Sequence, residues 1–264
     1  MFILEYVDEE TTILNNFTIA NEYELPSKGA VYNREVSPTF KLRSMTTMEE
    51  MKRLNHSDRP NKNICDIIDD CLLEDIGISA YDLCVPDFQY VLHKLRIVTY
   101  GPTYKLSCTC PWCGTSNSQT VNLDDLHLNE FNEDIFNKYS EFELPSCHKI
   151  MRIKMQTPRM LDTISVKVKE AKKNQAGFEG DPTLLYTLEE LVDTIDGVQP
   201  QKFKLTEFLK TMPMMDTNMI IKSAEKLNES FGLDKSLEHT CSVCGLDFTG
   251  NFRTTSEFFG PSID

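Results

Sequence analysis

The chain has 264 residues, and its hydrophobic fraction of 40% is large enough to bury a substantial core without disulfides. Its 41 acidic and 27 basic residues give a net charge of −14, which repels a nucleic-acid backbone unless one face is locally basic. No stretch reaches the roughly 18 apolar residues of a membrane span, and the start MFILEYVDEETT lacks the features of a secretory signal. We therefore expect a soluble chain of a reducing cytoplasm, with no membrane partner.

The amino-terminal residues lack a clear hydrophobic period. Residues 1–24 are therefore expected to form an extended arm, with one strand around Phe2–Tyr6. The sequence LPSKG at 25–29 is typical of a turn. Short stretches rich in Val, Tyr and Phe follow it at 30–32 and 39–42, and their composition predicts a small β-hairpin.

Three helical patterns follow this predicted hairpin. Thr46 and Glu49 form a capping-box signature, in which each side chain can satisfy a free amide at a helix start. Apolar residues then recur at helical spacing over 64–72, and again after Pro86, a residue suited to a first helical turn. We expect residues 25–100 to form a hairpin plus three helices.

The next stretch changes to β character. Residues 104–108 and 119–123 alternate and flank the sequence CPWCG, which predicts two strands joined by a cysteine knuckle. The acidic stretch 124–146 has no regular period, so we expect an irregular segment there. Residues 149–155 alternate again and predict a strand.

The last third of the chain begins with helical patterns and ends in a second cysteine knuckle. The helical patterns lie at 157–177, 187–197, 206–211 and 216–232. Residues 238–252 return to knuckle and β character. The prediction is an α+β fold, in which a discontinuous zinc-ribbon module, residues 101–156 and 233–264, carries a helical lobe inserted at 157–232.

Two C-x-x-C pairs, each followed by glycine, predict one structural zinc ion. A tetrahedral Zn²⁺ site takes four thiolate or imidazole ligands, and a C-x-x-C turn supplies two of them. The proposed ligands are Cys110, Cys113, Cys241 and Cys244. Because 127 residues separate Cys113 from Cys241, the ion would tie together both ends of the insertion. A four-cysteine site leaves no open position, so this zinc is expected to be structural rather than catalytic.

Other interpretations of the cysteines remain open. Each pair could be a dithiol without metal, and Cys108 could replace a neighbouring ligand, although C-x-C lacks the knuckle spacing. Cys147 and His148 could suggest a nucleophile with its base, but a surface loop explains adjacent residues more simply. The three cysteines on apolar helical faces are interpreted as small core residues: Cys65, Cys71 and Cys84.

Motifs of catalysis are missing from the sequence. It contains no G-x-x-x-x-G-K-[ST], G-x-G-x-x-G, H-E-x-x-H or G-x-S-x-G pattern, and its five histidines share no spacing. We therefore expect no catalytic residues, no further cofactor and no small-molecule substrate.

Several stretches occur in an order that resembles a known family. They are the PSKG sequence at 26–29, MTTMEE at 45–50, Asp82-Leu83, LRIVTYG at 95–101 and then the first knuckle. In this order they resemble the base-plate hub assembly family of T-even-like contractile-tailed phages, over residues 25–160. The resemblance implies a non-enzymatic protein that helps to build, or sits in, the central hub of the tail base plate.

The resemblance also implies partners and a location. The partners would be other phage tail base-plate hub proteins, met in the host cytoplasm during virion assembly or in the finished tail base plate. An alternative is a zinc-ribbon protein that binds nucleic acid or acts in transcription. The acidic net charge disfavours this alternative, because the basic clusters, at 152–154 and 167–173, are short.

Overall fold

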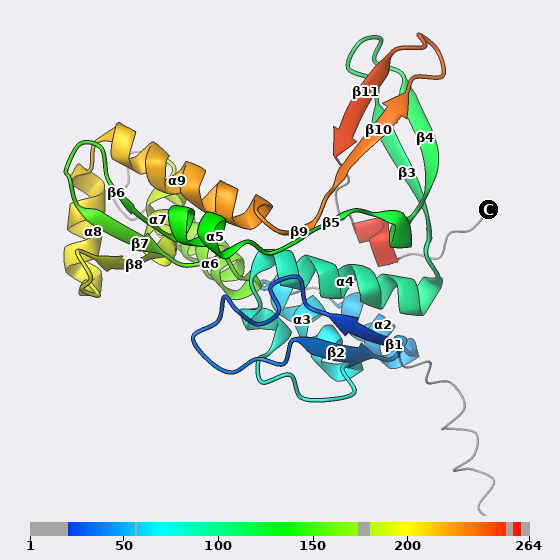
Figure 1. The fold of residues 1–264 in the computed structure, drawn as a ribbon, viewed down its shortest axis with the longest axis horizontal. Coiled ribbons are helices and arrows are strands. Elements are labelled where there is room, and N and C mark those ends of the chain that lie inside the picture. The colour runs from blue at the N-terminus through cyan, green and yellow to red at the C-terminus, as the bar shows by residue number, and fades with distance from the viewer. Residues whose placement is uncertain (1–20, 56, 174–179, 252–255, 260–264) are drawn as a thin grey trace, which may run out of the picture.

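The computed structural model describes residues 21–55, 57–173, 180–251 and 256–259. Helices and strands alternate irregularly along the chain, and the strands form small sheets (Figure 1). This arrangement confirms the predicted α+β fold class. Two packed lobes lie side by side, and a pair of β-hairpins projects away from them (Figure 1). The arm predicted at 1–24 falls almost wholly outside the described residues, as does its strand at 2–6.

The first lobe begins with an antiparallel pair, β1 (Asn21–Glu24) and β2 (Thr39–Leu42), in which Tyr23 faces Phe40. The prediction of a strand at 39–42 is confirmed, but the prediction that 30–32 forms its partner strand is wrong. That stretch lies in a turn, because Tyr32 donates a hydrogen bond of 2.6 Å to the buried carboxylate of Asp87 instead of joining a sheet.

Three helices complete this lobe, as predicted: α2 (Thr47–Arg53), α3 (Pro60–Cys71) and α4 (Val85–Tyr100). The capping box at the start of α2 is confirmed, since Thr46 and Glu49 bond to each other's backbone. Helix α3 has no side-chain cap of its own. Asp162 supplies one from another helix, accepting hydrogen bonds from the backbone of Asn61 and Lys62 at 3.3 and 2.9 Å.

The first core closes around α4 and includes the far end of the described chain. A short 3-10 helix, η3 (Ser256–Phe259), places Phe258 in this core with no exposed surface. The fully buried Arg96 of α4 donates from Nε to the carbonyl of Phe258, at 2.7 Å. Its Nη1 also donates to the carbonyl of Gly101 at 2.8 Å, so Arg96 holds both the end of α4 and the carboxy-terminal segment in place.

The second lobe packs a three-stranded sheet, in the order β6-β7-β8, against helices. Its strands are β6 (Glu141–Glu143), β7 (Ile150–Ile153) and β8 (Val192–Ile195), and its helices are α5 (Glu133–Ser140), α6 (Pro158–Lys173), α7 (Thr183–Leu191), α8 (Lys202–Thr211) and α9 (Met214–Glu229). Buried residues of β7 share this core with the helices. The domain boundaries drawn from the sequence stay a prediction.

Two expectations for this lobe are wrong. The stretch 124–146 is not irregular throughout, because α5 forms there with the Asn132 side chain as its cap. The second predicted helix of the insertion begins at Thr183 rather than Thr187 and ends at Leu191. Val192–Ile195 leaves the helix as strand β8, because these residues pair with β7.

The lobes meet where α6 lies against the first lobe. Besides capping α3, Asp162 is 1% exposed and accepts a hydrogen bond of 3.2 Å from the Tyr81 hydroxyl. Arg159 stacks on the Tyr81 ring, 4.4 Å from its centroid, and pairs with both carboxylate oxygens of Asp82 at 2.6 and 2.8 Å. Tyr81 and Asp82 belong to η1 (Ala80–Asp82).

Four strands form the projecting part as two antiparallel hairpins: β3 (Thr103–Thr109) with β4 (Ser116–Asn122), and β10 (Ser236–Thr240) with β11 (Asp247–Asn251). At their base lie η2 (Leu123–Asp125) and a two-residue pairing of β5 (Leu128–Asn129) with β9 (Gly232–Leu233). No helix among the described residues is long and apolar enough to cross a lipid bilayer.

Candidate metal centre

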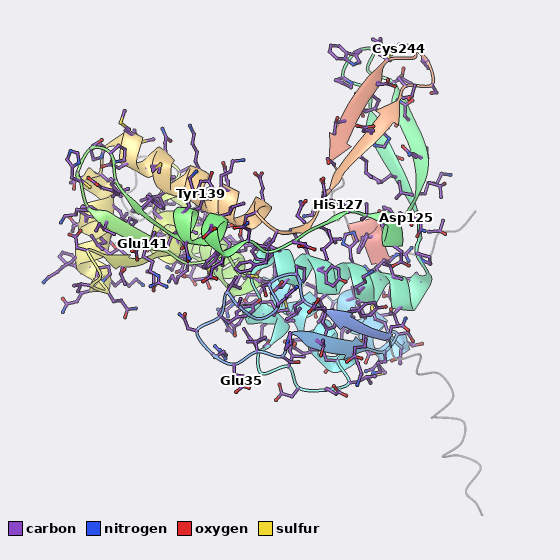
Figure 2. All side chains as sticks on the ribbon, in the orientation of Figure 1. Glu35, Asp125, His127, Tyr139, Glu141 and Cys244 are labelled. Carbon is purple, nitrogen blue, oxygen red and sulfur yellow. The ribbon has the colours of Figure 1, made fainter. Side chains whose placement is uncertain are left out.

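The two cysteine knuckles meet at the far end of the hairpins. One knuckle joins β3 to β4 and the other joins β10 to β11. The four sulfur atoms lie within 4.8 Å of one another. Cys110 Sγ is 3.8 Å from Cys244 Sγ, and Cys113 Sγ is 3.5 Å from Cys241 Sγ. The sulfurs of the two knuckles, remote in sequence, are thus interleaved in one cluster, whose outer end is marked by Cys244 in Figure 2.

Both knuckles use the same backbone design. The first cysteine of each donates its N–H to the carbonyl five residues on, at 2.8 Å for Cys110 and 3.0 Å for Cys241. The glycine after each pair returns its N–H to that first cysteine's carbonyl, at 3.0 and 2.9 Å. Gly114 and Gly245 have backbone φ angles of 73° and 70°, in the left-handed region that residues with a Cβ atom rarely adopt. This geometry explains why each pair is followed by glycine.

Hydrogen bonds in the knuckles favour the thiolate form at two positions. The backbone N–H groups of Cys244 and Val243 lower the pKa of Cys241 to about 6. The hydrogen bond with the Thr115 side chain is the largest cause that lowers the pKa of Cys113. Although the Leu246 N–H lowers the pKa of Cys244, burial and hydrogen bonds with the other three cysteines raise it to about 12. The contacts therefore favour the thiolate, the form that ligates metals, at Cys241 and Cys113 but not at Cys244.

Asn117 of β4 links the two knuckles and was not identified from the sequence. Its side chain is buried, and Nδ2 donates to the Thr115 carbonyl at 3.1 Å and to Cys241 Sγ at 3.6 Å. Its Oδ1 accepts from the backbone N–H and the hydroxyl of Ser242, each at 2.9 Å. One amide therefore holds the second knuckle against the first, a contact that no spacing in the sequence reveals.

The remaining cysteines lie elsewhere. Cys108 is half-buried on β3 and does not belong to the sulfur cluster that the described residues form. Cys65, Cys71 and Cys84 are buried, as core residues should be. Cys147 follows β6 in a turn, where its neighbour His148 contacts Glu143 at 2.8 Å.

The sulfur cluster fits a tetrahedral metal ion. Four thiolates about 2.3 Å from a central Zn²⁺ would lie about 3.8 Å apart, close to the two sulfur–sulfur distances given above. Four sulfur donors favour zinc or an iron–sulfur centre over the hard cations Mg²⁺ and Ca²⁺. These four cysteines could therefore bind a metal ion.

Comparison with known protein families identifies the family of this chain. The family model described as "T4 bacteriophage base plate protein" matches residues 17–260, nearly the whole chain and both knuckles. The chain belongs to this family. No curated protein and no solved structure matches it significantly. Membership supports a structural role in the phage base plate, among other base-plate proteins.

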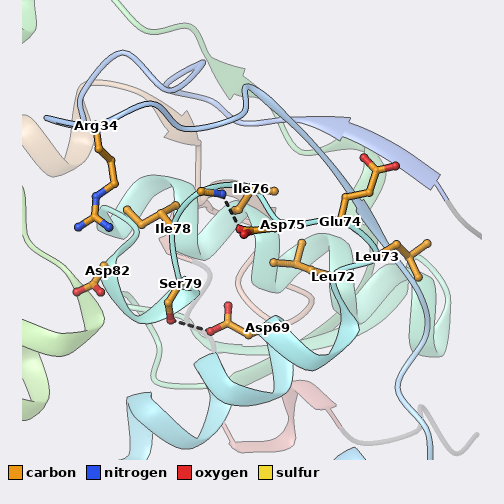
Figure 3. A pocket seen from close by; sticks show the side chains of 11 residues that line it. Arg34, Asp69, Leu72, Leu73, Glu74, Asp75, Ile76, Ile78, Ser79 and Asp82 are labelled. Carbon is orange, nitrogen blue, oxygen red and sulfur yellow. Dashed lines mark hydrogen bonds between the residues drawn. The ribbon is translucent and has the colours of Figure 1, made fainter.

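This base-plate protein also has a pocket of 630 Å³, lined mainly by the loop 72–79 between α3 and η1, together with Arg34, Asp69 of α3 and Asp82 of η1 (Figure 3). Asp69 accepts hydrogen bonds from the Ser79 hydroxyl at 2.6 Å and from the Ala80 N–H at 2.7 Å. Asp75 accepts from the Gly77 N–H at 2.8 Å. Asp82 pairs with an arginine of α6, which holds the pKa of this carboxyl below its usual range. The carboxylates of Asp69, Asp75 and Asp82 therefore stabilise the local fold through these contacts.

Proposed function

We propose that this chain is a non-enzymatic assembly factor or minor component of the base-plate hub, acting through protein contacts. The proposal includes one structural zinc ion bound by the four knuckle cysteines. It is carried by the cluster of four sulfurs within 4.8 Å, contributed by two hairpins that are far apart in the sequence but lie within one base-plate family match. Such a cross-link holds a surface in place and requires no reaction.

The hub assignment draws support from the stretches in which the chain resembles hub assembly proteins. Ser27, from the first stretch, donates its N–H and hydroxyl to Asp87 at 2.9 and 2.5 Å. In the second stretch, Met45 donates its N–H to the Thr99 hydroxyl at 3.1 Å. Glu50 accepts from the Tyr100 hydroxyl at 3.3 Å. The first two stretches therefore both contact α4, the helix that contains the LRIVTY part of the fourth.

Zinc is proposed because a closed set of four thiolates is its usual structural site. It would be held by the cysteine sulfurs, with the knuckle N–H groups and Asn117 supporting them. When bound, the ion supplies a fixed link between the hairpins and offers no open position for water or substrate.

An enzymatic function finds no support in the pocket described above, because its carboxylates already accept hydrogen bonds or pair with arginine. The nucleic-acid alternative finds none in the knuckles. Their loops, CPWCGT at 110–115 and CSVCGL at 241–246, contain no lysine or arginine to neutralise phosphate. We propose that the partners are hub proteins, met in the host cytoplasm as the virion assembles.

The test has two measurements on a tagged chain produced during infection. Metal analysis should find about one equivalent of zinc in the wild type and much less in the double variant Cys110→Ser, Cys241→Ser. Affinity purification should recover hub proteins with the wild type. A wild-type chain that holds no zinc contradicts the metal site, and one recovered alone at every stage of infection contradicts the hub assignment. Mature tails then show whether the chain stays in the virion.

A further inference from the structure

The end of the projecting hairpins carries large apolar side chains in solvent. Trp112 is 66% exposed, Val243 is 69% exposed and Leu246 is 50% exposed. Trp112 and Val243 occupy the same position in the two C-x-x-C loops, the residue before the second cysteine. Because the four sulfurs form one cluster, these side chains gather at one end of the module, which we call the knuckle tip.

The knuckle tip is also depleted of charge. In the segments 107–118 and 239–250, Asp247 is the only Asp, Glu, Lys or Arg, whereas these residues make up 26% of the chain. Its carboxylate accepts a hydrogen bond of 2.7 Å from the Thr240 hydroxyl. An aromatic residue surrounded by uncharged groups is the composition of an interface centre rather than of an ordinary solvated surface.

The tip is held in a defined geometry. The Trp112 indole N–H lies 3.5 Å from the Asp247 carbonyl of the opposite hairpin. Asn117 joins the knuckles on the inner side. The hairpins also extend the tip well beyond both lobes (Figure 2). A preorganised apolar projection loses little conformational freedom on binding, which favours insertion into a recess.

We propose that the knuckle tip docks, with Trp112 as its anchor, into an uncharged apolar recess on another base-plate protein. This inference rests on the base-plate function proposed above and adds the surface and the chemistry of the partner. The net charge of the chain favours a protein recess over the two other possible occupants. A second copy would bring two chains of net charge −14 together, and an anionic lipid surface would repel the same charge. An uncharged protein recess avoids both penalties.

The probe is base plates assembled in cells infected by a phage that lacks this protein. Purified zinc-loaded chain is mixed with them, and incorporation is measured after gradient sedimentation. Trp112→Ser and Val243→Ser should each reduce incorporation about 10-fold or more, as expected for anchor residues. Met48→Ser is the matched control, because Met48 is 63% exposed on α2 and should incorporate like the wild type. Incorporation should change less than about 2-fold between ~50 and ~500 mM salt.

Zinc content and circular dichroism show whether each variant keeps the fold. If folded Trp112→Ser and Val243→Ser incorporate like the wild type, the tip is not the docking surface. A wild-type dimer that Trp112→Ser dissociates, or binding to phosphatidylglycerol vesicles that Trp112→Ser abolishes, would assign the tip to those occupants and overturn the proposal. A wild-type chain that fails to incorporate would overturn this docking proposal, whereas the proposed function is contradicted only when the tagged chain is recovered alone at every stage of infection.

Discussion

Asn117 links the two knuckles beside the cluster of four sulfurs. It donates to Cys241 Sγ, one of the four sulfurs proposed to bind zinc, and accepts two hydrogen bonds from Ser242. Groups that orient a metal ligand commonly contribute 10- to 100-fold to affinity. An apolar substitution would remove all these contacts at once, while leaving the four thiols in place.

We predict that Asn117→Ala weakens zinc binding by about 10- to 100-fold. The measurement is competition with a chromophoric chelator at fixed pH. Gln119→Ala, at an exposed position of the same strand, is the control and should bind like the wild type. Equal affinities for the two variants would show that Asn117 packs in the module without supporting the metal.

Asp87 of α4 stabilises the first lobe by accepting hydrogen bonds from the turn between β1 and β2. Its fully buried carboxylate accepts from the N–H and hydroxyl of Ser27 and from the hydroxyl of Tyr32. We predict that Asp87→Ala lowers the free energy of unfolding by about 3 kcal/mol, because each buried donor left without a partner costs about 1–3 kcal/mol. Urea unfolding measures this change. The exposed Asp125 is the control, and Asp125→Ala should change stability by less than about 0.5 kcal/mol.

At the scale of single elements, the start of α2 should respond to pH. The hydrogen bond from Arg43 and those from Thr46 lower the pKa of Glu49 to about 2. A glutamate in the unfolded chain titrates near 4.3. The folded pKa is therefore below the unfolded one, so this contribution to stability is fully present above about pH 4.3 and is lost as the pH falls towards 2.

We predict that wild type is more stable than Glu49→Gln at pH 6 and that this difference shrinks steadily below about pH 4.3. Chemical unfolding at a series of pH values measures it. The comparison with Glu49→Gln isolates this one group from the other carboxylates that titrate in the same range. A difference that stays constant down to pH 2.5 would contradict the role given to the Arg43 pair.

The elements that the sequence predicted well are those with strong local signals. The capping box of α2, Pro86 in the first turn of α4 and the two C-x-x-C loops each appear where expected. Helix α5 was missed because it has only eight residues, in which Phe136 and Tyr139 cover the second core between acidic and polar neighbours. A helix of little more than two turns is too short for a clear period.

Other differences arose from contacts between distant residues. The Val192–Ile195 stretch continued a helical pattern, but pairing with β7 decides its conformation. The stretch 30–32 has the composition of a strand, but it forms a turn in which the Tyr32 hydroxyl donates to Asp87, a residue far away in the sequence. Asn117 belongs to the same class, because only the meeting of two hairpins gives its amide partners. Contacts between residues that are distant in the chain leave no recognisable pattern in a single sequence.

For the molecule as a whole, the cysteine cluster lies outside both cores. Neither core includes any of the four knuckle cysteines. The hairpins are anchored at their bases instead, by the pairing of β5 with β9 and by the bond from Arg96 to the Phe258 carbonyl. The lobes should therefore keep their fold when the metal is removed, and only the arrangement of the projecting hairpins should depend on the ion.

We predict that chelation of zinc increases amide hydrogen exchange in 103–122 and 236–251 but leaves α3, α4 and α9 protected. Trp112 is the single tryptophan, so its fluorescence reports on the knuckles alone, and loss of its contact with Asp247 should shift the emission to longer wavelength. Both changes should reverse when zinc is restored. Cys110→Ser with Cys241→Ser should show fast hairpin exchange from the start and no response to chelator. Exchange that spreads through α4 or α9 would instead mean that the ion supports the cores, since protection reports the free energy of local opening.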